Sequence, residues 1–301
     1  MVSHRRSWLA VLPLVAVLLA GCQSEPDDDG GPPDTIRIAS YDFSENQILA
    51  AVYAEAVKDA GLPVSLQPGA GTREVVEPAL EQGVVDVVID YVGTALEFAD
   101  RGSGIEPGSS EELHAALRET LGPRGVVVLD AAAAEDQNGF AVSTAFATEH
   151  GVSRLSELAP LAGGLTFGGP PECPQRPLCL PGLEEVYGLH FGDVVNMPSR
   201  AATVEALVAG QVQVGLLETT DARLAQAPVV LLADDLALQP HENVVPLVGE
   251  AVLDRWGEPL ADALNAASAR LTTADLIRLN RAVESEGLTA EQAAARWWDG
   301  A

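Results

Sequence analysis

Apolar and polar positions along the first part of the chain predict strands and helices in alternation. Apolar runs predict strands over residues 35–40, 64–66, 84–89 and 126–129. Apolar residues at helical spacing predict helices over residues 45–60, 74–82 and 111–121. The first helix is expected to end at Gly61, a residue that suits a helix C-terminus. A strand that is repeatedly followed by a helix indicates an α/β domain with a mainly parallel sheet.

The second part of the chain repeats this alternation and then changes to helices. Strands are predicted over residues 139–143, 165–167, 194–196, 212–217 and 229–232, and helices over 155–158, 182–187 and 201–209. From about residue 235, one strand at 244–248 precedes helices over 251–256, 260–271, 273–284 and 289–298. Because these helices have too few strands beside them to form another sheet, we expect this segment to return to the first domain. The pattern predicts two α/β lobes, residues 35–133 with 235–301 and residues 134–234, joined by two crossings.

The N-terminal segment has the features of an export signal. A basic stretch at residues 4–6 precedes an apolar run over residues 8–20, which is too short to span a bilayer. The run ends in Leu19-Ala20-Gly21-Cys22, the pattern of a bacterial lipoprotein cleavage site, and Cys22 would then be diacylated. An ordinary secretory signal with a chance cysteine is the alternative. We predict a signal peptide over residues 1–21 and a lipid anchor on the extracytoplasmic face of the cell membrane, because two or three acyl chains form a stable tether.

Charge and composition restrict the partners of the folded part. Residues 22–34 are polar, acidic and rich in turn formers, which is typical of a flexible tether. The whole chain has 44 acidic and 17 basic residues, a formal net charge of −27. A surface this acidic argues against a nucleic acid or an anionic lipid face as partner.

Beyond Cys22, the chain has two cysteines, Cys173 and Cys179. An even pair in an exported protein indicates a disulfide, which here would staple a local loop. A metal site is the rival interpretation, but two cysteines without a nearby pair of histidines are a weak pattern for one. We predict the disulfide and no metal.

Polar residues follow several predicted strands, where open α/β sheets bind their ligands. Four loops, at residues 40–46, 69–74, 90–94 and 218–221, could converge at one edge of the fold. The candidates in them are Tyr41, Asn46, Thr72, Tyr91, Thr94, Glu218, Thr219 and Thr220. Any one loop could serve only as a helix cap or turn, and Arg73 could either enter the cleft or pair with a neighbouring acid. The set as a whole indicates a binding site.

Three motifs of the first part resemble a known family. They are Asp-Phe-Ser-Glu at 42–45, Gly-Thr-Arg-Glu-Val-Val at 71–76 and Tyr-Val-Gly-Thr-Ala-Leu at 91–96. The stretch that holds them resembles the N-terminal lobe of glycine betaine/choline/carnitine-type substrate-binding proteins of ABC transporters. The resemblance extends over nearly the whole mature chain, through residues 165–189 and 238–248. It implies a type II periplasmic-binding-protein-like fold with a ligand cleft between two hinged lobes, which close over the ligand and dock on a permease.

The resemblance also implies a site that holds a quaternary ammonium by cation–π attraction in an aromatic cage. Tyr91 and Thr94 match binding residues of the family, and Asn46 falls where a polar contact is expected. The tyrosines expected in the second lobe and second crossing are replaced by Gln137-Asn138-Gly139-Phe140, Glu218 and His241-Glu242-Asn243.

Two interpretations of the site stay open. It could be a polar site for a hydroxylated or amide-bearing solute, with Gln137, Asn138, His241 and Asn243 as candidate ligand residues. It could also be a partial cage of Tyr91, Tyr41 and Phe140, with Glu218 as the counter-charge of a cation.

These observations predict an extracytoplasmic solute-binding protein of an ABC importer, which takes up a small compatible solute of the betaine/choline type for osmoprotection. Its partners would be the permease and ATPase subunits, and no cofactor is expected. The alternatives are the same role for another polar solute, such as ectoine or a glycosylated osmolyte, and a ligand-sensing lipoprotein. An enzyme is disfavoured, because the chain lacks the Gly-x-Ser-x-Gly, His-Glu-x-x-His and phosphate-loop motifs.

Overall fold

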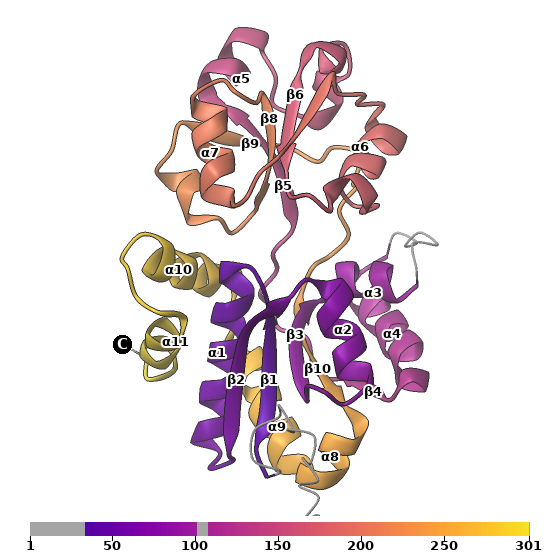
Figure 1. The fold of residues 1–301 in the computed structure, drawn as a ribbon, viewed down its shortest axis with the longest axis vertical. Helices are drawn as coiled ribbons and strands as arrows, with labels where there is room; N and C mark the ends of the chain where they lie inside the picture. Colours follow the sequence, from indigo (N-terminus) through magenta and orange to yellow (C-terminus); the bar gives the residue numbers. More distant parts are fainter. Residues whose placement is uncertain (1–33, 101–107, 301) are drawn as a thin grey trace, which may run out of the picture.

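The computed structural model describes residues 34–100 and 108–300. The predicted signal peptide, Cys22 and all of the predicted tether except Asp34 lie outside the described residues. Within them the chain forms two lobes, one above the other in Figure 1, and each lobe is built on a five-stranded sheet.

The first lobe contains both ends of the described chain. Its sheet has the order β2-β1-β3-β10-β4. The strands are β1 (Ile36–Tyr41), β2 (Val64–Gly71), β3 (Val87–Tyr91), β4 (Val126–Val128) and β10 (Val244–Gly249). The helices are α1 (Ser44–Asp59), α2 (Arg73–Glu81), α3 (Val92–Ala99), α4 (Ser110–Leu121), α8 (Glu250–Trp256), α9 (Glu258–Arg270), α10 (Thr273–Glu284) and α11 (Ala290–Trp298), with a 3-10 turn at Gly122–Arg124. The helices after β10 therefore return to the first lobe, where α9, α10 and α11 contact α1.

The second lobe has the sheet order β7-β6-β8-β5-β9. Its strands are β5 (Asn138–Ser143), β6 (Thr166–Gly169), β7 (Asp193–Asn196), β8 (Val214–Glu218) and β9 (Val229–Leu232). Its helices are α5 (Thr144–His150), α6 (Leu180–Tyr187) and α7 (Arg200–Val208), with 3-10 helices at Leu155–Leu158, Ala162–Gly164, Cys173–Gln175 and Ala222–Ala225.

Both sheets are mixed, but one strand in each runs opposite to the other four, so the prediction of a mainly parallel sheet in the first lobe is confirmed. In the first lobe β1 pairs parallel with β2 and β3, but β10 pairs antiparallel with β3 and β4. In the second lobe β6 pairs parallel with β7 and β8, but β5 pairs antiparallel with β8 and β9. The reason is that β5 and β10 each arrive from the other lobe. Each enters its sheet from the side that faces the other lobe, where the neighbouring strands end. It therefore runs opposite to those neighbours.

Most predicted elements match the observed ones to within a few residues, but the junctions between elements differ. The strand predicted at 84–89 is β3 at Val87–Tyr91, and β2 continues to Gly71 through a segment predicted as loop. The helices α3 and α5 were not predicted. Helix α3 begins directly after β3, and the side chain of its N-cap residue Tyr91 makes no capping hydrogen bond, so the local sequence carries no start signal for it.

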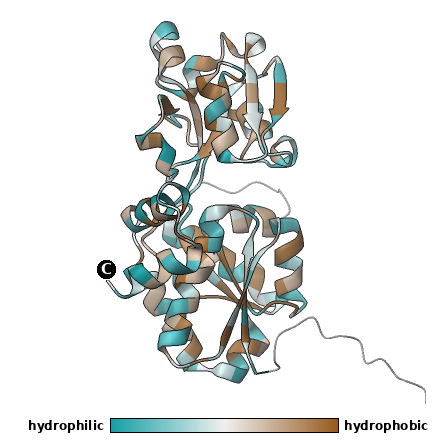
Figure 2. Ribbon diagram, turned by 60° about the vertical axis from the view of Figure 1, so that its left-hand side comes forward, coloured by the Kyte–Doolittle hydropathy of each residue, from teal (hydrophilic) through white to brown (hydrophobic). Residues whose placement is uncertain are grey.

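Strand β3 shows how the sheet of the first lobe is packed on both faces. It is buried along its whole length, as expected for a central strand that is covered on both faces. Val87 and Ile89 pack on one side with residues of α1, and Val88 packs on the other side with residues of α2 and α4. The second lobe also has a core on each face of its sheet. Figure 2 shows the apolar strands inside and more polar residues on the covering helices.

The two crossings lie side by side between the lobes. Glu135 and Asn243 form an antiparallel bridge, and Asp136 N–H donates to Glu242 O at 3.2 Å. The predicted boundary at 133/134 falls within the first crossing. The second crossing stays in contact with the second lobe as far as Gln239, whose side chain donates to Leu178 O at 2.9 Å.

Candidate functional site

A cleft of about 1090 Å³ lies between the lobes and is lined by both. It contains the residues that follow β1, β3 and β8, so the carboxyl ends of these strands meet at it, as in other α/β proteins. The acidic residues that line it are Asp42, Glu45, Glu74, Glu81, Glu97, Asp136, Glu172, Glu218, Asp221, Glu242 and Glu284. The basic ones are Arg73, Arg124, Arg176, Arg200 and Arg223, and the aromatic ones are Phe43, Tyr91 and Phe98. Acidic side chains therefore outnumber basic ones.

Glu45, in the first turn of α1, is the centre of the buried side of the cleft. Its Oε1 accepts from Tyr91 Oη–H at 2.6 Å, and Tyr91 is the last residue of β3. Its Oε2 accepts from Thr220 Oγ1–H at 2.5 Å and from Asn280 Nδ2–H at 2.6 Å. Burial raises the pKa of Glu45, although these three hydrogen bonds oppose the shift.

Asp136, in the first crossing, lies next to this group. Its Oδ1 accepts from the Thr220 N–H at 3.1 Å and from Thr219 Oγ1–H at 3.0 Å. Burial raises the pKa of Asp136 well above its ordinary value, and the nearby carboxyls of Glu45 and Glu218 add to the shift. We call Glu45, Asp136, Thr220 and Asn280 the buried junction, because they join α1 and α10 of the first lobe to the first crossing and the second lobe.

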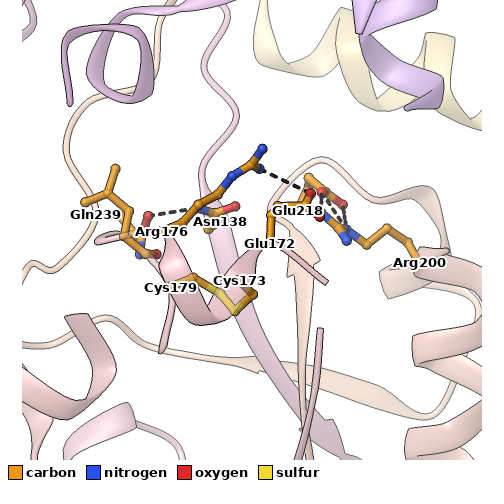
Figure 3. Close-up of a disulfide and its surroundings, with 9 residues drawn as sticks. Asn138, Glu172, Cys173, Arg176, Cys179, Arg200, Glu218 and Gln239 are labelled. Atoms are coloured by element: carbon orange, nitrogen blue, oxygen red, sulfur yellow. Dashed lines mark hydrogen bonds and ion pairs between the residues drawn. A yellow bond between two sulfur atoms is a disulfide. The ribbon is translucent and has the colours of Figure 1, made fainter. Parts of the chain in front are cut away.

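The opposite wall is formed by the loop of the second lobe that a disulfide closes (Figure 3). Cys173 and Cys179 are bonded, with their Cα atoms 5.3 Å apart. Arg176, at the centre of this loop, pairs with Glu172 of the same loop at 3.4 Å and with Glu74 of α2 in the first lobe at 3.3 Å. We call the Arg176–Glu74 pair the disulfide-loop contact.

Each cleft arginine is paired with a carboxylate in the described part of the chain. The pairs are Arg73–Asp90 at 2.5 Å, Arg124–Glu81 at 3.3 Å, Arg176–Glu74 at 3.3 Å, Arg200–Glu218 at 2.5 Å and Arg223–Glu284 at 2.7 Å. Figure 3 shows the Arg200–Glu218 pair beside the disulfide loop. The arginines are therefore neutralised by the protein's own carboxyl groups. The further acids of the lining favour a cation over an anion, because a nearby positive charge stabilises the ionised form of a carboxyl group.

The sequence-predicted site residues divide into two groups. Those that line the cleft are Thr72, Tyr91, Thr94, Asn138, Glu218 and Thr220. Those outside its lining are Tyr41, Asn46, Gln137, Phe140, Thr219, His241 and Asn243.

Tyr41, Asn46 and Phe140 are buried inside the lobes. Tyr41 Oη–H donates to Asp90, which also binds Arg73. Asn46 uses its whole amide on the backbone: Oδ1 accepts from the Tyr41 N–H and Nδ2–H donates to Ile89 O, both at 2.7 Å. Phe140 packs in the second-lobe core, with its ring centroid 6.2 Å from that of Phe167. The predicted partial cage of Tyr91, Tyr41 and Phe140 is therefore not assembled. The aromatic neighbour of Tyr91 is Phe43, at 6.3 Å between ring centroids.

The remaining four residues hold the crossings together. Gln137 N–H donates to Thr219 Oγ1 at 3.0 Å, and the Gln137 side chain donates to Pro240 O at 2.8 Å. His241 Nδ1 lies 2.8 Å from Glu135 Oε1, with half of its side chain exposed. Asn243 Nδ2–H donates to Ala132 O at 3.0 Å.

Several residues of the site were missed. Phe43 and Glu45 lie in the Asp-Phe-Ser-Glu motif, and Glu242 stands between His241 and Asn243, so proximity to predicted residues could have found them. Asn280 lies in a helix far along the chain and no sequence signal marks it. The described residues contain no group of three or more His, Cys, Asp or Glu placed to hold a metal. Nor does any helix in the described ranges have the length and apolarity needed to cross a membrane.

Two α/β lobes, two crossings and a polar cleft between them define a protein that binds a solute by enclosing it. Comparison with known proteins agrees: residues 34–300 match the substrate-binding domain of ABC-type glycine betaine transport systems (OpuAC). The chain therefore belongs to this family and is an extracytoplasmic substrate-binding protein of an ABC transporter of the glycine betaine/choline/carnitine class.

Individual relatives also match over most of the chain. The chain is 30% identical over 278 residues to the glycine-betaine-binding protein of Pseudomonas aeruginosa, covering 87% of this chain and 86% of the relative. It is 24% identical over 270 residues to the glycine betaine-binding protein YehZ of Escherichia coli, and the match covers 86% of this chain and 88% of the relative. A crystal structure described as a glycine betaine/carnitine/choline ABC transporter is similar in fold, with a TM-score of 0.70 at 21% identity over 88% of this chain and 98% of the other.

Proposed function

We propose that this chain binds a quaternary-ammonium solute of the betaine, choline and carnitine type in the interlobe cleft and delivers it to the permease and ATPase of an importer. The observation that carries this proposal is the surplus of carboxyl groups in a cleft that also presents the Tyr91 and Phe43 rings. A cation is favoured beside these carboxyl groups, which can ionise against it, and can lie against an aromatic face.

The names of the relatives support the same ligand class, since the protein from Pseudomonas aeruginosa is named for glycine betaine and that from Listeria monocytogenes for carnitine transport. Attachment through a lipid on Cys22, as the N-terminal pattern predicts, would keep the protein beside its permease. Accumulation of such a solute would give osmoprotection.

Calorimetric titration of the chain that begins at Gln23 tests this proposal. The ligands are glycine betaine, choline, carnitine, proline betaine, ectoine and a glycosylated glycerate. We expect micromolar binding of at least one quaternary amine, and a loss of about tenfold in Tyr91→Ala from the lost ring. The variant Tyr91→Phe keeps the ring and serves as the matched control. Binding of only ectoine or the glycosylated solute by folded protein would keep the transporter role and refute the quaternary-ammonium ligand.

A further inference from the structure

Glu242 lies in the second crossing, and its side chain reaches the first turn of α3. The Thr94 N–H donates to Glu242 Oε2 at 2.9 Å, and Thr94 Oγ1–H donates to Glu242 Oε1. Glu242 is 1% exposed, and both residues line the cleft. The protein's own carboxyl group thus occupies two hydrogen-bond donors in the cleft wall.

The first turn of α3 is where a carboxylate is favoured electrostatically. Its free N–H groups carry partial positive charge, and the N-cap residue Tyr91 supplies no side-chain acceptor. The second crossing supplies the acceptors instead: Asn243 O accepts from the Val92 N–H at 3.0 Å, and Glu242 accepts from Thr94. A ligand carboxylate would have to displace Glu242 to bind there.

Close packing holds the crossing in this place. A Cβ added to Gly93 would lie 2.4 Å from Pro240 Cγ and 2.8 Å from His241 O. Only glycine lets the crossing lie this close to the start of α3. Glu242 is therefore positioned by the backbone on both sides of it.

The arginines of the cleft are already engaged. The cleft arginines are paired with carboxylates of the described chain, as shown above. Independently, Asn280, a residue of the cleft wall that is 3% exposed, has a buried Oδ1 without a hydrogen-bond partner among the described residues. A buried acceptor that lacks a donor favours a ligand that brings an O–H or N–H group.

We propose that Glu242 is a specificity-determining residue, which excludes carboxylated ligands from Thr94 by occupying it with its own carboxyl group. The cleft then selects a hydroxylated quaternary-ammonium cation, of which choline is the simplest, over zwitterions such as glycine betaine. This inference rests on the proposed function, because it presupposes that a quaternary ammonium binds in the cleft.

The test is calorimetric titration of choline and glycine betaine into the wild-type protein, Glu242→Ala and Glu242→Gln. We expect the wild type to bind choline at least tenfold more tightly than glycine betaine. Glu242→Ala frees the two hydrogen-bond donors of Thr94 for a ligand carboxylate. The affinity for glycine betaine should therefore rise, and the preference for choline should fall at least tenfold. Glu242→Gln keeps the volume but replaces one of the two acceptor oxygens by an N–H group, so its preference should lie between the two.

Glu135→Gln is the matched control. Glu135 Oε1 accepts from the Glu242 backbone N–H at 3.0 Å, but Glu135 neither contacts Thr94 nor lines the cleft. This variant should keep the wild-type preference, and circular dichroism verifies that each variant is folded.

The outcomes separate the two proposals. Equal affinity of the wild type for both ligands, or an unchanged preference in folded Glu242→Ala, overturns the role of Glu242 and leaves the proposed function standing. If Glu242→Ala does not fold, an unchanged preference in Glu242→Gln overturns it equally. Absence of binding by every quaternary amine refutes both.

Discussion

The two lobes contact each other at two places that differ in burial and in chemistry. At the buried junction Glu45 and Thr220 are nearly inaccessible to solvent, and three donors converge on one carboxyl group. At the disulfide-loop contact Arg176 and Glu74 are partly exposed and form one ion pair. Hydrogen bonds inside a protein are costly to break, whereas a surface ion pair contributes about 0–1 kcal/mol. We therefore expect the buried junction to act as the pivot between the lobes, and the cleft to open at the disulfide loop.

Among the substitutions that test this difference between the two contacts, Glu45→Ala is expected to have the largest effect on stability. The substitution leaves the donors of Tyr91, Thr220 and Asn280 without their common acceptor, which should lower the free energy of unfolding by about 2–4 kcal/mol. Ligand affinity should fall as well. Urea denaturation and calorimetry measure the two losses, with Asp59→Asn, at the exposed end of the same helix, as the control. A loss below 1 kcal/mol would contradict the role of the junction as the pivot.

The next effect concerns the covalent closure of the disulfide loop. Replacing Cys173 and Cys179 by serine removes a short loop closure, which should cost about 2 kcal/mol. Because Arg176 lies in this loop, we also expect faster ligand release, measured by stopped-flow fluorescence. Unchanged stability together with unchanged release would show that the loop does not need the disulfide.

The pH dependence sharpens the comparison, because acids on the two sides titrate differently. Burial raises the pKa of Glu242 in the cleft wall to about 8, against opposing hydrogen bonds from Thr94. At the disulfide-loop contact, hydrogen bonds from Thr72 and Arg176 lower the pKa of Glu74, although partial burial by itself would raise it. A bound cation favours the charged form of an acid, so cation binding should release protons from the acids with raised pKa values.

The affinity for choline should therefore increase as the pH rises from 6 to 9, by at most about tenfold per unit for each proton released. The stability of the unliganded protein should change with pH in the opposite direction. The contribution of Glu242 to stability is complete below its ordinary pKa of 4.5 and is lost as the pH rises through about 8. Calorimetry in buffers of different ionisation enthalpy counts the protons. An affinity that falls with pH would contradict the acidic character of the site.

The smallest effect is expected from Arg176→Ala. It removes an exposed ion pair, so stability should change by less than about 1 kcal/mol. Ligand release should become modestly faster, and the effect should shrink at high salt because salt screens the pair. A loss as large as that of Glu45→Ala would contradict the assignment of this contact as the weak one.

Much of the fold could be predicted because its signals are local. Helix α1 begins one residue before the predicted start and ends one residue before the predicted end, since the apolar spacing and Gly61 mark both limits. The direction of a single strand was not predicted, because it depends on the partner strand. Nothing in β10 itself shows that it enters the first sheet from the interlobe edge and runs antiparallel to β3.

The site was predicted less completely, for the same reason. The loops after β1, β3 and β8 could be located, because strand ends and helix starts are local features. Which side chains of a loop enter the cleft could not be decided: in the first loop Glu45 and Phe43 line it, while Tyr41 and Asn46 are used inside the lobe.

The sequence by itself determined the order of elements, the two-lobed α/β organisation, the family and the acidic character of this protein, because periodicity, motifs and charge are carried by residues close together in the chain. Only the tertiary structure decided that Asn280 approaches Glu45, 235 residues away in the chain, and that Glu242 occupies the start of α3. Such contacts depend on how helices and crossings pack in three dimensions, and packing brings together residues whose local sequences carry no mark of each other.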